Sequence, residues 1–174
     1  RQGTSLMLRK ISQQDVGDVL SPLSPVKTLS SNSASATKLL GARLAGFLPP
    51  GTTIGLIGEL GTGKTQFVKG IAAGLGIPEA EVVSPSFGLI NIYAGKKGLC
   101  HADLYRLETL DDIATIGLED FPSGNGLCVV EWADRLGEGH DFFDIIVYFK
   151  WVAKGKRALR VDTCDTLKDC LQNL

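Results

Sequence analysis

Hydrophobic and polar residues follow two different patterns along this chain of 174 residues. Thr53–Ile57 is a short, β-branched, apolar run that suits a buried parallel strand. Further strands are predicted at 88–93, 99–103 and 126–131. Phe67, Ile71 and Leu75 recur every four residues and predict one apolar face of a helix, which ends before Gly76. The mixture of both patterns predicts an α/β fold.

The ends of the chain add a second kind of strand pattern and short helices. Ser33 or Ser35 can cap a helix that runs to about Leu48. Residues 143–151 and 157–162 alternate strongly between apolar and polar, which predicts a β-hairpin. Shorter helices are predicted at 110–115 and 165–171. Together these elements predict one three-layer sandwich over residues 34–174, whose mixed sheet has a parallel centre and an antiparallel C-terminal hairpin.

Residues 1–33 differ from the rest of the chain. They are rich in Ser, Gln and Pro and show little apolar periodicity, so we expect mostly a disordered tail. Within it, 26–29 could form an edge strand. The chain begins with Arg1, and its single Met is Met7, so we expect residues 1–6 to be a cloning remnant.

Composition excludes some classes of protein. The net charge is −1 and no run of Lys or Arg occurs, so the chain is not an obvious nucleic-acid binder, and we expect any RNA connection to run through a partner. No apolar stretch approaches the roughly 20 residues that span a bilayer, and no secretory signal is present, so we expect no membrane association and a cytoplasmic location.

The strongest motif lies between the strand at 53–57 and the helix that follows. Residues 58–65 read Gly-Glu-Leu-Gly-Thr-Gly-Lys-Thr, a complete G-x-x-x-x-G-K-[ST] phosphate-binding (Walker A) loop. Its glycines let successive N–H groups point at one anion, Lys64 reaches the β- and γ-phosphates, and Thr65 offers a hydroxyl to Mg²⁺. A glycine-rich turn that merely joins a strand to a helix is the alternative, but such a turn has no need of Gly-Lys-Thr. The motif therefore predicts a P-loop NTPase.

A phosphate loop needs a carboxylate for its metal ion, commonly at the end of a buried strand. Glu131 ends the apolar run 127–131 and is the first candidate, and Asp103, at the end of 99–103, is the second. Capping a helix or forming an ion pair is the alternative role for either acid. The chain has no N-K-x-D and no L-S-G-G-Q sequence, so we expect neither a GTPase nor a transporter ATPase, but a protein that binds ATP.

Several further motifs follow the loop in a fixed order. They read Ser-Pro-Ser-Phe at 84–87, His-Ala-Asp-Leu-Tyr-Arg-Leu at 101–107, Gly-Leu-Glu-Asp at 117–120 and Glu-Trp at 131–132. With these motifs the chain resembles the TsaE (YjeE) family of small bacterial P-loop ATPases over about residues 34–160. Ser86 departs from the family pattern, in which Thr is usual, but it keeps the hydroxyl.

The resemblance implies a function and a set of site residues. Family members take part in making threonylcarbamoyladenosine in tRNA, which implies a Mg²⁺-dependent ATPase that drives or resets the TsaD–TsaB threonylcarbamoyltransferase assembly, with tRNA involved only indirectly. Lys64, Asp103 and Glu131 would be catalytic, and Asp103 would orient or deprotonate the attacking water. Thr65 and Glu131 would hold Mg²⁺. The residues implied to bind the nucleotide are Thr37, Gly61, Thr62, Gly63, Lys64, Thr65, Gln66, Asp103, Trp132, Asp134 and Arg157.

Some of these assignments have alternatives. Thr37 could simply occupy the first turn of its helix, and Trp132 could be a core or rim aromatic side chain. Residues 84–87 match a switch-like segment near the terminal phosphate. His101 could support Asp103, although a hydrogen-bonded histidine within a strand is the favoured interpretation.

Two other functions remain open at this point. A nucleotide-gated binding module would bind ATP without significant turnover. A small-molecule P-loop kinase is a second alternative, but such kinases need an arginine-rich lid, and residues 118–141 contain only Arg135 among Lys and Arg.

Overall fold

The structure, a computed structural model, describes residues 23–85, 89–107, 109, 111–112, 116–118, 121, 125–137, 139–172 and 174. Its strands are β1 Ser24–Ser31, β2 Thr53–Ile57, β3 Ile90–Tyr93, β4 Leu99–Asp103, β5 Leu127–Glu131, β6 Ile145–Ala153 and β7 Lys156–Thr163. Its α-helices are α1 Ala34–Phe47, α2 Lys64–Gly74 and α4 Lys168–Leu171. Its 3-10 helices are η1 Glu79–Glu81, η3 Ala133–Leu136, η4 Gly139–Phe142 and η5 Asp165–Leu167. Most of the helix predicted at 110–115 falls outside the described residues.

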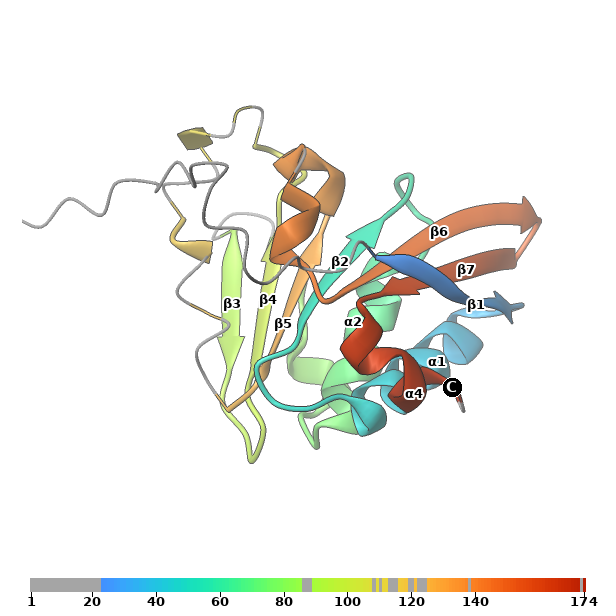
Figure 1. The fold of residues 1–174 in the computed structure, drawn as a ribbon, viewed down its shortest axis with the longest axis horizontal. Coiled ribbons are helices and arrows are strands. Elements are labelled where there is room, and N and C mark those ends of the chain that lie inside the picture. Colours follow the sequence, from blue (N-terminus) through green and yellow to red (C-terminus); the bar gives the residue numbers. More distant parts are fainter. Residues whose placement is uncertain are drawn as a thin grey trace, which may run out of the picture.

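The strands form one mixed sheet in the order β1-β7-β6-β2-β5-β4-β3 (Figure 1). The four central strands β6, β2, β5 and β4 are parallel to one another. Strands β6 and β7 form the expected antiparallel hairpin, and β1 extends it. The prediction of a parallel centre and an antiparallel C-terminal hairpin is therefore confirmed. A second antiparallel pair, β3 with β4, forms the opposite edge.

Both faces of the central sheet are covered. Leu127 and Val129 of β5 join a cluster with α1, α2 and α4, whereas Cys128 and Val130 face a second cluster. This double burial explains why β5 is apolar throughout rather than alternating. Over the second face the described residues include the short helices η3 and η4, which contribute Ala133 to that cluster and pack Phe142 against it. The expected three-layer sandwich is thus observed in part.

Helices α1 and α2 approach each other at glycines. A Cβ atom at Gly41 would lie 2.3 Å from the carbonyl oxygen of Phe67, and one at Gly70 would lie 2.0 Å from that of Lys38. Only a residue without a side chain fits at either position. The close contact fixes the N-terminal part of α1 beside the start of α2. Ser33 caps α1 by accepting a hydrogen bond from the N–H of Ala36 at 3.0 Å.

Strand β1 lies inside the segment 1–33 that we expected to be mostly disordered. The edge strand predicted at 26–29 is confirmed and extends over Ser24–Ser31, paired with β7. The ordered fold thus begins before residue 34. Residues 1–22, including the expected remnant 1–6, lie outside the described residues. Within the described part of the chain, no helix has the length and apolar character needed to cross a bilayer.

Candidate active site

The phosphate-binding motif forms the connection from β2 to α2. Gly63 has a φ angle of +103° directly before the first residue of α2, and Gly58, at the end of β2, has a φ angle of +154°. Side chains are strained at such angles, and a Cβ atom at Gly58 would also lie 2.7 Å from the carbonyl oxygen of Phe149. The loop therefore requires glycine at these positions. The N-terminus of α2 faces the cleft beside the loop, where an anion can bind.

Lys64 is the first residue of α2 and is almost fully buried. Its Nζ donates hydrogen bonds to the carbonyl oxygens of Gly58 at 2.6 Å and Glu59 at 3.0 Å, and lies 3.8 Å from the ring centre of Trp132. Burial lowers the pKa of Lys64 below its ordinary value of 10.5, and the carboxylates Glu131, Asp103 and Asp134 offset part of this effect. The ammonium group is thus held by neutral partners that an anion can replace.

Trp132 follows the last residue of β5 and has a φ angle of +60°, which is uncommon for a bulky side chain. This conformation turns its ring over Lys64. The ring of Tyr105 packs against that of Trp132 at a centroid distance of 4.9 Å. The backbone of Trp132 therefore turns sharply between β5 and η3, and such uncommon conformations are frequent at binding sites.

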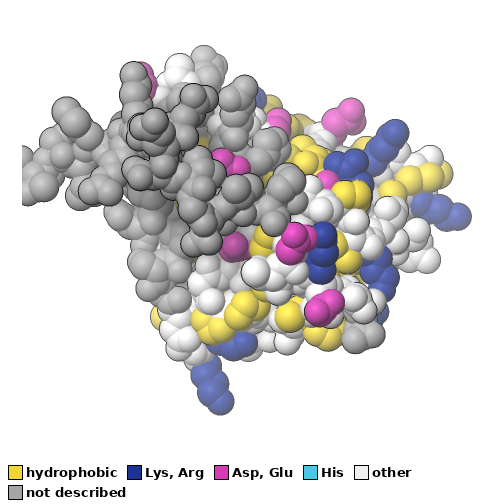
Figure 2. Space-filling view, in the orientation of Figure 1, with side chains coloured by type: hydrophobic (Ala, Val, Ile, Leu, Met, Phe, Trp, Pro, Cys, Tyr) yellow, Lys and Arg dark blue, Asp and Glu magenta, His cyan; other side chains and the backbone are white. Residues whose placement is uncertain are grey.

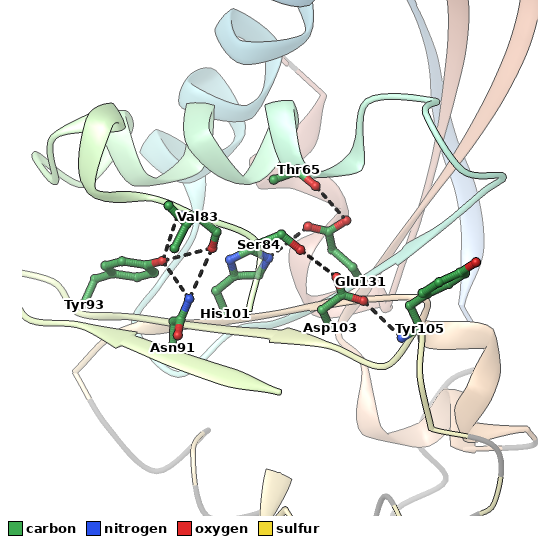
Figure 3. A network of polar contacts seen from close by, with 9 residues as sticks. All are labelled: Thr65, Val83, Ser84, Asn91, Tyr93, His101, Asp103, Tyr105 and Glu131. Atoms are coloured by element: carbon green, nitrogen blue, oxygen red, sulfur yellow. Dashed lines mark hydrogen bonds and ion pairs between the residues drawn. The ribbon is translucent and has the colours of Figure 1, made fainter. Parts of the chain in front are cut away.

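Glu131 lies at the C-terminal end of β5 and is buried. Its Oε2 accepts a hydrogen bond from the Thr65 hydroxyl at 3.1 Å, and its Oε1 lies 2.9 Å from Nε2 of His101 (Figure 3). The hydroxyl and the carboxylate are hard oxygen ligands next to each other, which suits Mg²⁺. Among the described residues no group of three or more His, Cys, Asp and Glu could hold a metal. A magnesium ion here would therefore complete its coordination with phosphate oxygens and water.

Asp103 ends β4 and lies opposite Glu131 in the register of the two parallel strands. Its Oδ2 accepts a hydrogen bond from the Ser84 hydroxyl at 2.7 Å, and its Oδ1 accepts one from the backbone N–H of Tyr105 at 3.0 Å. Since both strands end at the same edge of the sheet, the two carboxylates come together beside the loop (Figure 3).

The segment that carries Ser84 is fixed to the sheet from the other side. The hydroxyl of Tyr93 lies 3.2 Å from both the N–H and the carbonyl oxygen of Val83, and Asn91 donates to the same carbonyl at 3.2 Å (Figure 3). These contacts hold the backbone next to Ser84 in place, and the Ser84 side chain points from it toward Asp103. Of the predicted switch-like segment 84–87, Ser86 and Phe87 lie outside the described residues.

These groups surround one cleft of about 360 Å³, large enough for part of a nucleotide. It is lined by Leu60, Gly61, Gly63, Lys64, Thr65, Gln66, Ser84, Pro85, Leu89, Asp103, Tyr105, Arg106, Glu131 and Trp132. Leu60, Leu89, Tyr105 and Arg106 were not among the predicted site residues. For Tyr105 and Arg106 the signal was their position directly after the strand that ends in Asp103.

Thr37 and Arg157 are not among the residues that line the cleft, but they lie directly behind the loop. Nη1 of Arg157 donates to the Thr37 hydroxyl at 2.7 Å, and a Cβ atom at Gly63 would lie 3.2 Å from that Nη1. Thr37 occupies the first turn of α1 and also shares a hydrogen bond of 2.7 Å with the hydroxyl of Ser31. The two residues thus form a polar wall on the far side of Gly63.

Three other predicted residues take different positions. Thr62 is buried and donates to the carbonyl oxygen of Glu59 at 2.8 Å, so it shapes the loop. Asp134 is exposed at the start of η3 and does not line the cleft, although its charge acts on Lys64. His101 is a hydrogen-bonded histidine within β4, as favoured above, and its partner is Glu131 rather than Asp103.

Comparison with known proteins identifies the family to which this chain belongs. The model described as "Threonylcarbamoyl adenosine biosynthesis protein TsaE" matches residues 31–158. The chain belongs to the TsaE family. The TsaE match begins in β1 and includes the loop, both strand-terminal carboxylates, Thr37 and Arg157. The family resemblance predicted from the ordered motifs is therefore confirmed.

Individual TsaE proteins are similar over most of their length. The "tRNA threonylcarbamoyladenosine biosynthesis protein TsaE" of Treponema pallidum (strain Nichols) is 39% identical over 131 residues, which cover 75% of this chain and 96% of the relative. The protein of the same name from Aquifex aeolicus (strain VF5) is 35% identical over 138 residues, covering 78% and 96%. The crystal structure of Bacillus subtilis YdiB superposes with a TM-score of 0.68 at 27% identity, covering 87% of this chain and 94% of YdiB.

Proposed function

We propose that this TsaE-family chain is a Mg²⁺-dependent ATPase that supports threonylcarbamoyladenosine modification of tRNA. One observation carries the proposal: the phosphate-binding loop, the Thr65–Glu131 pair and Asp103 all face the same cleft. The loop supplies the anion site, and the Thr65–Glu131 pair supplies metal ligands. The carboxylate of Asp103 belongs to neither and can act on the attacking water. This combination is what hydrolysis of a nucleoside triphosphate requires.

Binding of the triphosphate would depend on the loop amides and on Lys64. The ammonium group now rests on two carbonyl oxygens and the face of Trp132, all of them neutral. A phosphate oxygen is a stronger acceptor for a buried cation than a carbonyl oxygen. Lys64 would therefore turn from the loop backbone to the β- and γ-phosphates, and its contact with Trp132 would weaken.

Thr65 and Glu131 would hold the magnesium ion, which neutralises charge on the transferred phosphoryl group. The Thr65 hydroxyl, which now donates to Oε2 of Glu131, would present its oxygen lone pair instead. Asp103 would orient or deprotonate the attacking water. Its two hydrogen bonds, from Ser84 and from the N–H of Tyr105, keep its carboxylate directed at the cleft while leaving lone pairs for that water.

The assembly that this ATPase serves would be the pair TsaD and TsaB. In this proposal the transfer of the threonylcarbamoyl group belongs to those proteins, and hydrolysis by this chain drives or resets them. The net charge of −1 agrees with contact to tRNA only through the partners. The names of the relatives, which assign them to tRNA threonylcarbamoyladenosine biosynthesis, support the same pathway.

Two substitutions test the proposal. Lys64→Ala should weaken ATP binding about 10- to 100-fold, because a charged hydrogen bond of about 1.5–3 kcal/mol is lost. Asp103→Asn should lower turnover about 10²- to 10⁴-fold while changing ATP affinity by less than about threefold. Lys69→Ala is the matched control, since Lys69 lies on the same helix and does not line the cleft.

Turnover is measured as inorganic phosphate released, with and without TsaD and TsaB, and ATP affinity by calorimetry. ATP binding without multiple turnovers, even with the partners present, would instead identify a nucleotide-gated binding module. Radiolabelled γ-phosphate transferred to a metabolite would identify a kinase. Equal turnover in Asp103→Asn and the unaltered protein would remove Asp103 from the mechanism.

A further inference from the structure

We infer that His101 is a positioning residue, whose Nε2–H donates to Oε1 of Glu131 and thereby directs Oε2 at Thr65 and the metal position between them. The inference rests on the proposed function, because it assumes that Glu131 serves a magnesium ion. It assigns a role to a buried side chain that neither the loop motif nor the catalytic acid explains.

The contact is made in the interior of the protein. The side chain of His101 has 0% exposure, and that of Glu131 has 4%. Val129 lies opposite His101 in the register of β4 and β5, so His101 and Glu131 are diagonal neighbours. In Figure 3 the imidazole lies beneath the start of α2, and the carboxylate stands between it and Thr65. The carboxylate of Glu131 is thus hydrogen-bonded on both sides, by Thr65 at Oε2 and by His101 at Oε1.

The surroundings of the two imidazole nitrogens favour one tautomer. Nδ1 of His101 is buried and has no hydrogen-bond partner among the described residues. A proton on Nδ1 would therefore be a buried donor without an acceptor, whereas a proton on Nε2 has the carboxylate 2.9 Å away. The tautomer with hydrogen on Nε2 satisfies the donor and leaves only a lone pair unpaired.

This bond restricts a carboxylate that could otherwise rotate. Histidines and carboxylates behind metal ligands fix ligand orientation, and their loss commonly weakens metal affinity about 10- to 100-fold. Without the Nε2 donor, Oε1 would be a buried acceptor with no replacement, so Glu131 would turn toward solvent. This rotation would move Oε2 away from Thr65. The phosphate loop itself would be unaffected.

Three substitutions separate this role from simple core packing. His101→Gln can place its amide N–H at the position of Nε2, because both nitrogens are the same number of bonds from Cβ. His101→Asn is also an amide but is one bond shorter, so it cannot reach Oε1. His101→Phe keeps a ring and loses the donor. Val129→Ala is the matched control for stability, since Val129 is fully buried opposite His101 and contributes no polar group.

The measurement is binding of a fluorescent ATP analogue, titrated with Mg²⁺ and repeated in EDTA. We expect His101→Phe and His101→Asn to need about 10- to 100-fold more Mg²⁺ for tight binding, with affinity in EDTA unchanged within about twofold. His101→Gln should stay within about threefold of the unaltered protein. Val129→Ala should lower the melting temperature without changing the Mg²⁺ requirement.

A Mg²⁺ requirement that is the same in His101→Asn, His101→Gln and the unaltered protein would overturn the inference and leave His101 as a core residue. The Asn–Gln pair decides the question even if His101→Phe fails to fold. If the unaltered protein binds the analogue with no dependence on Mg²⁺, the proposed function itself fails. The two failures are thus distinguished by the behaviour of the unaltered protein.

Discussion

Replacing Gly70 with alanine tests the close contact between α1 and α2. The new Cβ atom would lie 2.0 Å from the carbonyl oxygen of Lys38 and 2.7 Å from its carbonyl carbon, whereas real Cβ atoms almost never come within 3.0 Å of a neighbour. These neighbours belong to the backbone of α1, so no side chain can turn away to relieve the overlap. The two helices must instead separate locally by about 1 Å.

The cost can be compared with the gain. Overpacking a core typically costs about 1–3 kcal/mol, and a required backbone shift puts Gly70→Ala at the upper end. Alanine in place of glycine recovers about 1 kcal/mol of helix propensity. We therefore expect the free energy of unfolding to fall by about 2 kcal/mol, which lowers the melting temperature by about 4–8 °C in a chain of this size.

Gly46→Ala is the matched control. Gly46 also lies in α1, but a Cβ atom there would meet nothing within 4 Å, so the same substitution should stabilise the protein by up to about 1 kcal/mol. Urea unfolding and thermal melting of both variants measure the difference. If Gly70→Ala stabilises as Gly46→Ala does, the helices do not approach each other at Gly70 and the packing argument is wrong.

Three other predictions concern the site and its support. Because burial lowers the pKa of Lys64, its free ammonium group should lose the proton below the ordinary lysine value of 10.5, and ATP affinity should then fall about tenfold per pH unit. A flat calorimetric profile to about pH 10.5 contradicts this. ATP should change the tryptophan fluorescence as Lys64 leaves the ring of Trp132; the change should disappear in Trp132→Phe and persist in Trp151→Phe, and the reverse result would reject this motion. Ser33→Ala should cost about 1 kcal/mol of stability in urea unfolding by removing the cap of α1; an unchanged unfolding midpoint would show that the cap is not needed.

The parts of the molecule that sequence reasoning predicted well are local ones. The strand β2, the loop and α2 follow one another within a short stretch, and each has its own signal: a β-branched run, a phosphate motif and a four-residue spacing. The carboxylates Asp103 and Glu131 were predictable because each ends an apolar strand. Their proximity to the loop follows from the parallel arrangement of those strands.

The relations between distant segments were harder to predict. The favoured interpretation of His101 as a hydrogen-bonded strand histidine is confirmed, but its partner, Glu131, is set by the register of β4 against β5. That register depends on packing across the whole sheet. The glycines of α1 and α2 lower the helix propensity of both segments, so the sequence alone argues against them. Their role, which is to let the two helices approach closely, depends on the tertiary contact. The antiparallel pairing of β3 with β4 was not predicted either, although the short glycine-containing connection between them is typical of a hairpin.

The hydrogen bond between Arg157 and Thr37 joins positions 120 residues apart. During synthesis on the ribosome, α1, β2, the loop and α2 emerge well before the last hairpin, and local units of this kind can begin to fold early. The wall behind Gly63, however, stays open until β7 has been made. A chain interrupted between β5 and β6 would thus carry the whole phosphate motif but lack Arg157, so the Thr37 hydroxyl would keep only its partners Ser31 and Ser33. Completion of the polar wall behind the phosphate-binding loop is in this sense a late event in the life of each new polypeptide.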